Sequence, residues 1–467
     1  MKKLLIPLLC LICSNIFSQT TGQQLSAALK KLEGDEQFKH AIISMYVVDS
    51  KTGKVIVDKN AQVGLAPASC QKVVTSVSAF ELLGKEYKYK TEIGYDGELK
   101  EMNLKGNLYA IGYGDPTLGS WRWEKTSEVI VLNNFKEAIS KKINKIEGNI
   151  FGYDRKWESN ITPNGWVWED IGNYYGAGAA ALNWRENQYD VYLKAGEKIG
   201  DRVTINKIIP IPEATGLISE VITAAKGSGD NAYIFLPPYS NYGFVRGTIP
   251  LGENNFKISG SIPDPGGQMI NELAKVITKP NDEILFVGSY NGIEVEKKDL
   301  PVKPVIFFTH YSPPIDSINY WFLKKSVNLY GEALVKTIAY EKLKFGSTDS
   351  GIAIIKDFWS KRGIEKSALN IIDGSGLSPA NRVTTNALVT VMQYARQQKW
   401  FSSFYYALPE MNGIKMKDGY INGVRSYTGY VKSKNGSEYT FSFSVNNFDG
   451  NSGTVREKMW KVLDILR

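Results

Sequence analysis

The residue composition and the length of the helical and strand patterns change twice along the chain. This change constrains the fold more than any other sequence feature. From residue 90 to about residue 302 the sequence is rich in short strands, glycines and aromatic residues. Longer helical and strand patterns precede and follow this middle part. At 467 residues the chain is long enough for two or three domains. We therefore expect one domain built from both ends of the chain and interrupted by a long insertion.

The two ends of the chain each supply a hairpin to one predicted sheet. An Asn435-Gly436 pair between alternating segments is the strongest hairpin signal in the sequence. Thr454 and Glu457 predict a capping box that opens a helix with one apolar stripe. We expect this helix to lie across the sheet. The predicted strands are residues 41–49, 54–58, 424–432 and 438–445.

Residues 1–18 resemble a secretory signal peptide, with Lys2 and Lys3 before a short apolar run. The run is too short to span a membrane as a helix. An exported, periplasmic protein is therefore expected, with at most peripheral contact with a membrane. Removal of this peptide would leave Cys70 as the single cysteine, so no internal disulfide is expected.

The histidine count and the charge exclude several classes of function. His40 and His310 are the only histidines, which argues against a Ser-His-Asp triad and against a histidine-rich metal site. Without the signal peptide, 54 basic and 48 acidic side chains remain. This mild excess suits contact with anionic polymers of the cell envelope but is too small to indicate nucleic-acid binding. No metal and no cofactor are predicted.

Ser69 and Lys72 form the strongest catalytic candidate. Their spacing of three residues, at the start of an apolar helical segment, places both side chains on one face of a helix. A serine becomes a strong nucleophile when a neighbouring base takes its proton, and a lysine can be that base. The alternative is a helix start with a solvated lysine. Two observations oppose it: the helix is too apolar for a solvated face, and no other Ser-x-x-Lys occurs in the chain.

A cluster of aromatic and acidic residues in the middle of the chain allows two interpretations. It could form a surface that holds a sugar or a peptide, with Asp170 as a substrate-binding residue, or it could be buried packing. The cluster consists of Trp166, Trp168, Glu169, Asp170, Tyr174 and Tyr175.

Seven motifs, in this order and spacing, resemble the class C low-molecular-mass penicillin-binding proteins, the D-alanyl-D-alanine carboxypeptidase/endopeptidase family. The resemblance covers nearly all of the mature chain, and the order and spacing are more specific than any single motif. The motifs are residues 69–72, 112–118, 165–170, 247–252, 312–314, 326–332 and 373–378.

The resemblance implies an α+β fold. It consists of a transpeptidase/β-lactamase-like domain, an antiparallel sheet flanked by helices, with two nested β-rich domains inserted in it. The 257 residues between Ser69 and Ser326 match such an insertion. The implied domains are residues 19–89 with 304–467 for the catalytic domain, 90–185 with 258–303 for domain II, and 186–257 for domain III.

The resemblance also implies the roles of the site residues. Ser69 is the nucleophile and Lys72 its base, Ser326 relays the proton to the leaving nitrogen, and Asn328 positions Lys72 and the substrate. Lys417 completes this catalytic set and would lower the pKa of Lys72 by charge repulsion. The backbone N–H groups of Ser69 and Tyr420 would bind the oxyanion.

The third motif of the family, Lys-Thr-Gly, aligns with Lys417, Asp418 and Gly419, so an aspartate replaces the threonine. Residues 51–53 spell Lys-Thr-Gly but precede the nucleophile in a hairpin turn, and we reject them on position. In similar proteins the threonine helps bind a substrate carboxylate. Asp418, Gly419 and Tyr420 are therefore substrate-binding candidates, and Asp418 would repel that carboxylate unless it pairs with Lys417 or turns away.

The implied function is a serine D,D-peptidase that acts on peptidoglycan stem peptides through an acyl-serine intermediate. It would be a D-Ala-D-Ala carboxypeptidase, a D,D-endopeptidase on crosslinks, or both, and Asp418 favours endopeptidase action. β-Lactams are the expected covalent inhibitors. The alternative is a catalytically weakened protein of the same fold that binds peptidoglycan.

Overall fold

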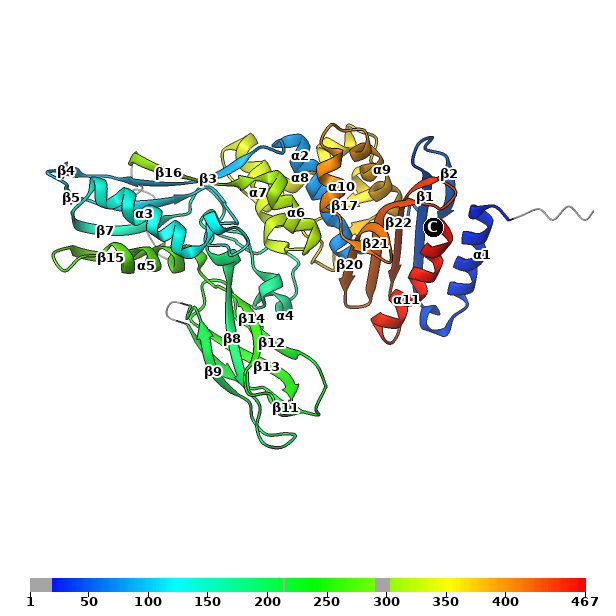
Figure 1. Ribbon diagram of the computed structural model, residues 1–467, viewed down its shortest axis with the longest axis horizontal. Helices are drawn as coiled ribbons and strands as arrows, with labels where there is room; N and C mark the ends of the chain where they lie inside the picture. Colours follow the sequence, from blue (N-terminus) through cyan, green and yellow to red (C-terminus); the bar gives the residue numbers. More distant parts are fainter. Residues whose placement is uncertain (1–18, 213–214, 290–302) are drawn as a thin grey trace, which may run out of the picture.

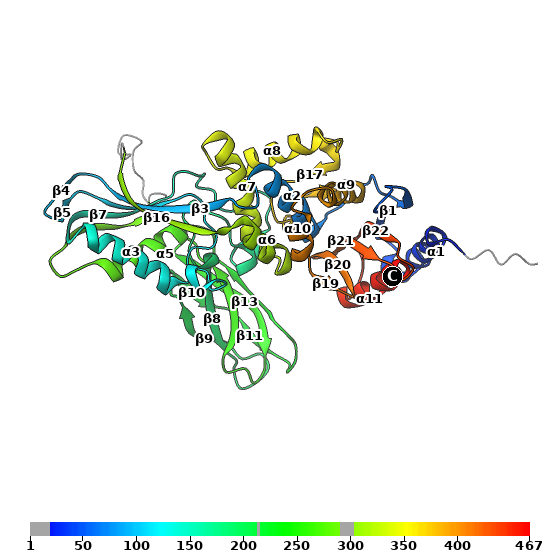
Figure 2. The same cartoon turned by 45° about the horizontal axis from the view of Figure 1, so that its top comes forward.

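The computed structural model describes residues 19–212, 215–289 and 303–467, so the predicted signal peptide lies outside the described residues. The molecule is elongated, with a six-stranded sheet at one end and a seven-stranded sheet at the other (Figure 1). Two smaller sheets project to one side, as the turned view also shows (Figure 2). In the described part of the chain, no helix combines the length and apolar character that crossing a membrane requires.

The six-stranded sheet joins the two ends of the chain, as the sequence predicts. In spatial order its strands are β19 (Glu410–Met411), β20 (Ile414–Ile421), β21 (Val424–Lys432), β22 (Glu438–Asn446), β1 (Ile42–Asp49) and β2 (Val55–Lys59). All neighbours are antiparallel. The two predicted hairpins meet where β1 pairs with β22, from Ile42 opposite Asn446 to Asp49 opposite Tyr439.

Two helices from opposite ends of the chain cover one face of this sheet, α1 (Thr21–Glu33) and α11 (Ser452–Leu463). The apolar stripe of α11 packs on the sheet as predicted. The predicted capping box is wrong. Asn451 caps the helix instead, with its side chain accepting hydrogen bonds from the N–H groups of Gly453 and Thr454. An asparagine at this position stabilises a helix start three residues earlier than a Thr454 cap would.

The other face of the sheet is covered by a helical layer that shares one apolar core. The sequence predicts one largely helical segment over residues 319–344, but the structure breaks it into two helices on either side of Ser326, whose φ is 56°. The helices of this layer are α2 (Lys72–Leu82), α6 (Ile315–Lys324), α7 (Asn328–Leu343), α8 (Thr348–Ser360), α9 (Thr385–Arg396) and α10 (Phe401–Ala407). A two-stranded sheet, β17 (Leu369–Asn370) with β18 (Arg382–Val383), lies between α8 and α9 in sequence.

The seven-stranded sheet forms the bulk of the insertion, and α3 (Glu128–Lys142) and α5 (Pro265–Ile277) pack together on one of its faces. Its main strand order is β16 (Val305–Pro314), β3 (Lys88–Tyr95), β6 (Leu108–Gly112), β7 (Lys145–Tyr153), β5 (Asn103–Lys105) and β4 (Glu98–Lys100). A further strand, β15 (Glu283–Ser289), pairs with β7 in parallel.

Two small sheets share a separate apolar core within the insertion. One has the order β14 (Phe256–Ser261), β8 (Gln188–Lys194) and β9 (Thr204–Ile209). The other has the order β10 (Gly216–Ser219), β13 (Tyr242–Pro250) and β11 (Ile222–Ala224), with β12 (Asn231–Phe235) also pairing with β13.

Two strands suggest adjusting the predicted domain boundaries. β16 lies after the predicted boundary at residue 304, yet it pairs with β3 in the seven-stranded sheet. β14 crosses the predicted boundary at residue 257, yet it pairs along its length with β8. Because strands of one sheet share their hydrogen bonds, we propose to assign β16 to domain II and β14 to domain III. The short helix α4 (Trp168–Ile171) then lies in the part of domain II that faces domain III.

Candidate active site

Ser69 lies in a short 3₁₀ turn, η2 (Ala68–Gln71), that runs directly into α2. Lys72 is the first residue of that helix. The sequence predicts a continuous helix here, and the structure tightens its first turn. The predicted proximity of the two side chains is present, since Lys72 Nζ lies 2.9 Å from Ser69 Oγ.

Two hydrogen bonds from neighbouring elements hold this turn against the sheet. Ser426 of β21 donates to the carbonyl oxygen of Pro67 at 2.5 Å. The thiol of Cys70 donates to the carbonyl oxygen of Lys417 at 3.2 Å. Cys70 is fully buried, and burial raises the pKa of its thiol to about 11, so the thiol stays protonated at neutral pH. A buried, protonated thiol has a structural role here.

The side chain of Lys72 is fully buried, and all its hydrogen-bond acceptors are uncharged. Besides Ser69 Oγ, Nζ donates to Asn328 Oδ1 at 2.6 Å and to the carbonyl oxygen of Ser375 at 2.8 Å. These three acceptors orient Nζ without neutralising a positive charge on it. The absence of a contacting carboxylate makes loss of the proton easier than it would be in an ion pair.

The pKa of Lys72 is lowered to about 7. Burial is the largest cause, and repulsion from the Lys417 ammonium acts in the same direction. The carboxyl groups of Asp373, Glu332 and Asp418 oppose both effects. Near neutral pH a large fraction of Lys72 is therefore uncharged and able to accept a proton.

The carbonyl group of Ser375 is fixed by a tight loop, residues 373–378, built around the buried carboxylate of Asp373. Five donors satisfy this carboxylate, which compensates the cost of burying it. They are Gln71 Nε2, Trp166 Nε1, Asn381 Nδ2 and the backbone N–H groups of Gly376 and Ser378, at 2.7 to 3.0 Å.

Glu332 of α7 supports the same loop from the opposite side. Its Oε2 accepts a hydrogen bond from the backbone N–H of Gly374 at 2.9 Å. Burial, together with repulsion from Asp373, raises the pKa of Glu332 to about 8. Much of Glu332 is therefore protonated at neutral pH, so the effect by which its charge raises the pKa of Lys72 is weakened.

Lys417 and Asp418 form an ion pair on β20. Lys417 is buried, and its Nζ lies 2.7 Å from Asp418 Oδ1 and 2.8 Å from the carbonyl oxygen of Asp418. The Asp418 side chain is 37% exposed. Burial acts to raise the pKa of Asp418, but the charge and hydrogen bond of Lys417, together with smaller effects that include the charge of Arg425, outweigh it and the pKa is lowered. Asp418 is thus ionised at neutral pH and neutralises the lysine beside it.

Gly419 and Tyr420 shape the adjoining stretch of β20. A Cβ atom at Gly419 would lie 2.6 Å from the carbonyl oxygen of Pro67, so only glycine permits this approach of η2 to the strand. The Tyr420 side chain is 54% exposed, with the Arg425 guanidinium 4.9 Å from its ring centroid. β19 pairs with Ile414 and Lys415, and the N–H of Met416 donates to the carbonyl oxygen of Pro409 at 3.0 Å. Beyond Met416, no strand of the described chain pairs with that edge of β20, which is the kind of edge that can accept an extended peptide.

The connection between α6 and α7 brings Asn328, and not Ser326, into contact with Lys72. Asn328 Oδ1 accepts from Lys72, while its Nδ2 donates to the carbonyl oxygen of Tyr175 at 2.7 Å. Ser326 lies two residues earlier, partly buried, in the left-handed backbone region. The described hydrogen bonds of Lys72 do not include Ser326.

The aromatic and acidic cluster is part buried packing and part exposed surface, so both interpretations apply to different members. Trp166 is buried and bonds to Asp373, whereas Trp168 is 48% exposed. Burial and the neighbouring Glu169 raise the pKa of Asp170 to about 6, against the effect of a hydrogen bond from Tyr175. Asp170 is therefore linked to Lys72 indirectly, through Tyr175 and Asn328.

Three contributors to the site had no assigned role in the sequence analysis. Glu332 and Ser375 appeared there only within motifs, and Tyr175 only within the aromatic cluster. Ser375 and Tyr175 act through backbone carbonyl groups, which leave no signal in residue identity. Nowhere in the described chain do three or more His, Cys, Asp or Glu side chains gather as metal ligands would.

Comparisons with known proteins agree with this geometry. The family model "D-Ala-D-Ala carboxypeptidase 3 (S13) family" matches residues 25–411. A D-alanyl-D-alanine carboxypeptidase of Actinomadura sp. is 24% identical over 486 residues, which cover 96% of this chain and 86% of that protein. The D-alanyl-D-alanine carboxypeptidase DacB of Haemophilus influenzae is 23% identical over 419 residues, covering 85% and 83%.

The crystal structure of penicillin-binding protein 4 (dacB) from H. influenzae superposes with a TM-score of 0.77 at 21% identity, over 94% of this chain and 97% of that one. This match confirms the predicted transpeptidase-like fold with its insertion. The resemblance to class C low-molecular-mass penicillin-binding proteins is likewise confirmed. The chain belongs to the D-Ala-D-Ala carboxypeptidase 3 (S13) family.

Proposed function

We propose that this chain is a periplasmic serine D,D-peptidase that cleaves peptidoglycan stem peptides through an acyl-serine intermediate. The observation that carries the proposal is the placement of a buried Lys72 Nζ, with a pKa of about 7, at 2.9 Å from Ser69 Oγ. A base of this pKa is matched to proton transfer at neutral pH. The family and the names of the relatives support the substrate class.

In the proposed acylation, neutral Lys72 takes the proton of Ser69, and the serine oxygen attacks the carbonyl carbon between two D-amino acids. A C–O bond forms while the C–N bond breaks. The leaving nitrogen receives a proton, for which Ser326 is the proposed relay. Asn328 holds Lys72 in position through its amide oxygen. In the second half-reaction Lys72 takes a proton from a water molecule, whose oxygen attacks the ester carbonyl carbon. The bond between that carbon and Ser69 Oγ breaks, the acid product leaves, and Lys72 passes the proton from water to Ser69 Oγ.

The developing oxyanion would be bound by the backbone N–H groups of Ser69 and Tyr420. Donors placed in this way each lower the activation barrier by about 3 kcal/mol. The approach of η2 to β20 at Gly419 is what brings these two backbone segments together. Asp170, half-buried beside Tyr175, is the proposed contact for hydrogen-bond donors of the substrate peptide.

We favour endopeptidase action on crosslinks over carboxypeptidase action, and the ion pair between Lys417 and Asp418 supports this preference. A free terminal carboxylate would have to compete with Asp418 for Lys417. The same ion pair supports the second candidate, a catalytically weakened protein that binds peptidoglycan.

Incubation with crosslinked peptidoglycan fragments and with peptides ending in D-Ala-D-Ala, for the wild type and for Ser69→Ala, tests the proposal. We expect crosslink cleavage by the wild type only, and an acyl adduct with penicillin on Ser69 by mass spectrometry. No cleavage by either protein, with binding retained, would establish the weakened binding protein. Cleavage by the Ser69→Ala variant would exclude Ser69 as the nucleophile.

A further inference from the structure

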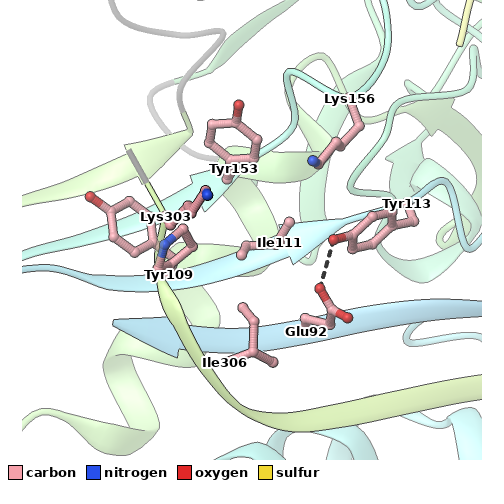
Figure 3. Close-up of a pocket in the computed structure, with 9 residues that line it drawn as sticks. Glu92, Tyr109, Ile111, Tyr113, Tyr153, Lys156, Lys303 and Ile306 are labelled. Atoms are coloured by element: carbon pink, nitrogen blue, oxygen red, sulfur yellow. Dashed lines mark hydrogen bonds between the residues drawn. The ribbon is translucent and has the colours of Figure 1, made fainter. Parts of the chain in front are cut away.

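A pocket of about 350 Å³ lies on the face of the seven-stranded sheet opposite α3 and α5 (Figure 3). Side chains alternate along β6, so that Leu108 and Ala110 join the core under the helices while Tyr109 and Ile111 face the other way. The lining residues are Glu92, Tyr109, Ile111, Tyr113, Tyr153, Lys156, Lys303, Pro304 and Ile306.

The lining carries an excess of positive charge. Neither Lys156 nor Lys303 forms an ion pair with a carboxylate among the described residues. Glu92 is the one carboxylate of the lining, and it is occupied: it accepts hydrogen bonds from Lys90 Nζ and from the Tyr113 hydroxyl, both at 2.6 Å. A pocket with two unpaired ammonium groups favours an anionic ligand.

The walls are aromatic. Lys156 Nζ lies 5.5 Å from the ring centroid of Tyr113 and 6.0 Å from that of Tyr153, so one ammonium group is placed beside two rings. Figure 3 shows Tyr109, Tyr113 and Tyr153 arranged around the same opening. Tyrosine offers a flat apolar face together with a hydroxyl group. A sugar ring matches this pattern, because its C–H faces pack on aromatic rings and its hydroxyl groups form hydrogen bonds.

We propose that this pocket binds a sugar residue of the peptidoglycan strand that carries a carboxylate beside the ring. The carboxylate would lie at Lys156 and Lys303, and the ring against the tyrosines. It is either the lactyl carboxylate of a sugar without a peptide or the first carboxylate of an attached stem peptide. This inference rests on the proposed function for the identity of the polymer.

The position of the pocket fits a polymer better than a small substrate. Tyr113 packs edge-on against Tyr340 of α7, with ring centroids 5.9 Å apart. Asn328, at the start of the same helix, bonds to Lys72. Twelve residues of α-helix between Asn328 and Tyr340 rise about 18 Å. A short peptide bound at Ser69 does not reach the pocket, whereas another part of the same polymer does.

Binding of peptide-free glycan oligosaccharides, disaccharide-peptides and sugar-free stem peptides to the full chain tests the assignment. The Ser69→Ala background prevents cleavage during calorimetry. We expect the two sugar-containing ligands to bind, and Lys156→Glu to weaken their binding about tenfold. The control is Lys207→Glu, which makes the same charge change at a lysine 6.0 Å from the ring centroid of Tyr192, outside the pocket. Equal binding by both variants, or binding of sugar-free peptides alone, overturns the proposal.

Turnover separates this proposal from the proposed function. With otherwise wild-type sequence, Lys156→Glu should raise KM for polymeric peptidoglycan about tenfold and leave turnover of a short soluble peptide unchanged. Lys156→Arg should restore the polymer KM. A parallel loss on both substrates would show general damage and overturn the pocket assignment. If the wild type cleaves neither substrate, the proposed function fails, and the binding measurement still decides whether the pocket holds sugar.

Discussion

Two buried lysines meet at the candidate site, and their surroundings differ in one respect. Lys72, on the helical layer, donates only to uncharged groups, among them Ser69 and Asn328. Lys417, on the sheet, is paired with the carboxylate of Asp418. Both side chains are almost fully buried, at 0% and 1% exposed. Burial is thus common to both lysines, and the carboxylate in contact with Lys417 is what distinguishes its surroundings from those of Lys72.

The two lysines are also coupled to each other. The Lys417 ammonium lowers the pKa of Lys72, whereas Asp418 raises it. Asp418 therefore affects Lys72 although it lies on the sheet and Lys72 lies on the helical layer. In the proposed function, Asp418 would therefore act both on substrate binding and on Lys72 as the base, and separate variants distinguish the two effects.

The largest effect on the acylation rate is expected when Lys72 is replaced by a residue that cannot become neutral. Lys72→Arg keeps a positive charge and donors but cannot act as a base, because a guanidinium keeps its proton at any working pH. Loss of a general base costs roughly 10²–10⁴ in rate, so we expect penicillin acylation of Ser69 to fall about 10³-fold. Stopped-flow acylation followed by mass spectrometry measures this.

The control for that variant is Lys90→Arg, at a lysine of the insertion paired with Glu92. It should acylate at the wild-type rate. A Lys72→Arg variant that retains more than a tenth of the wild-type rate would assign the base to another group and remove the contrast between the two lysines.

The second prediction concerns the loop of residues 373–378, which fixes the Ser375 carbonyl group that accepts a hydrogen bond from Lys72. Asp373→Asn replaces one acceptor oxygen by an NH₂ group that faces existing donors, so buried groups lose their partners. We expect a loss of roughly 3 kcal/mol in the free energy of unfolding, measured by urea denaturation. Acylation should fall as well, because the carbonyl of Ser375 is no longer fixed.

Asp96→Asn is the matched control for Asp373→Asn. Asp96 also accepts from several donors, Asn107 and Tyr109 among them, but it lies in the seven-stranded sheet. This variant should lower stability without changing the acylation rate relative to folded protein. Equal acylation rates for both folded variants would mean that the loop of residues 373–378 does not position Lys72.

Alternation and turn residues in the sequence predicted those strands and turns whose form depends on neighbouring residues. The two hairpins of the six-stranded sheet followed from alternation and from the Asn435-Gly436 turn, whose Gly436 has a φ of 86°. The helix starts were less accurate: Asn451 caps α11, where the sequence predicted a cap at Thr454. Capping depends on which of several adjacent polar residues turns inward, and spacing does not specify this.

In the candidate site, too, contacts between residues close in sequence could be predicted, whereas contacts set by tertiary structure could not. The spacing of Ser69 and Lys72 predicted their contact, because one turn of a helix fixes it. The ion pair of Lys417 with Asp418 was only one of several possibilities, since adjacent residues on a strand point to opposite faces and the pair forms only if a long lysine side chain folds back. Contributions of backbone carbonyl groups, such as that of Ser375, depend on tertiary contacts alone.

A smaller effect on penicillin acylation is expected from changing Asp418, the ion-pair partner of Lys417. Asp418→Thr removes a carboxylate that would repel the carboxylate of penicillin by about 1 kcal/mol. Acylation of Ser69 by penicillin should therefore rise about fivefold, measured as the second-order rate constant. Glu410→Thr, an exposed acidic residue on the neighbouring strand β19, is the control and should leave the rate unchanged. Matching rates for wild type and Asp418→Thr would mean that the ion pair already cancels the repulsion.

The smallest effect is a shift in pH dependence, and it tests the coupling directly. Acylation by the wild type should rise with pH through about 7, as Lys72 loses its proton. Asp418→Asn removes a negative charge that favours the protonated form of Lys72, and it leaves the Lys417 ammonium without a counter-charge. Both changes lower the pKa of Lys72, so the rise should move to lower pH, by about half a unit. Pre-steady-state acylation from pH 5 to 9 measures the midpoint, with Asp349→Asn on the exposed surface of α8 as control. A midpoint that stays in place or moves to higher pH would mean that Asp418 does not raise the pKa of Lys72, and would contradict the coupling between the sheet and the helical layer at this site.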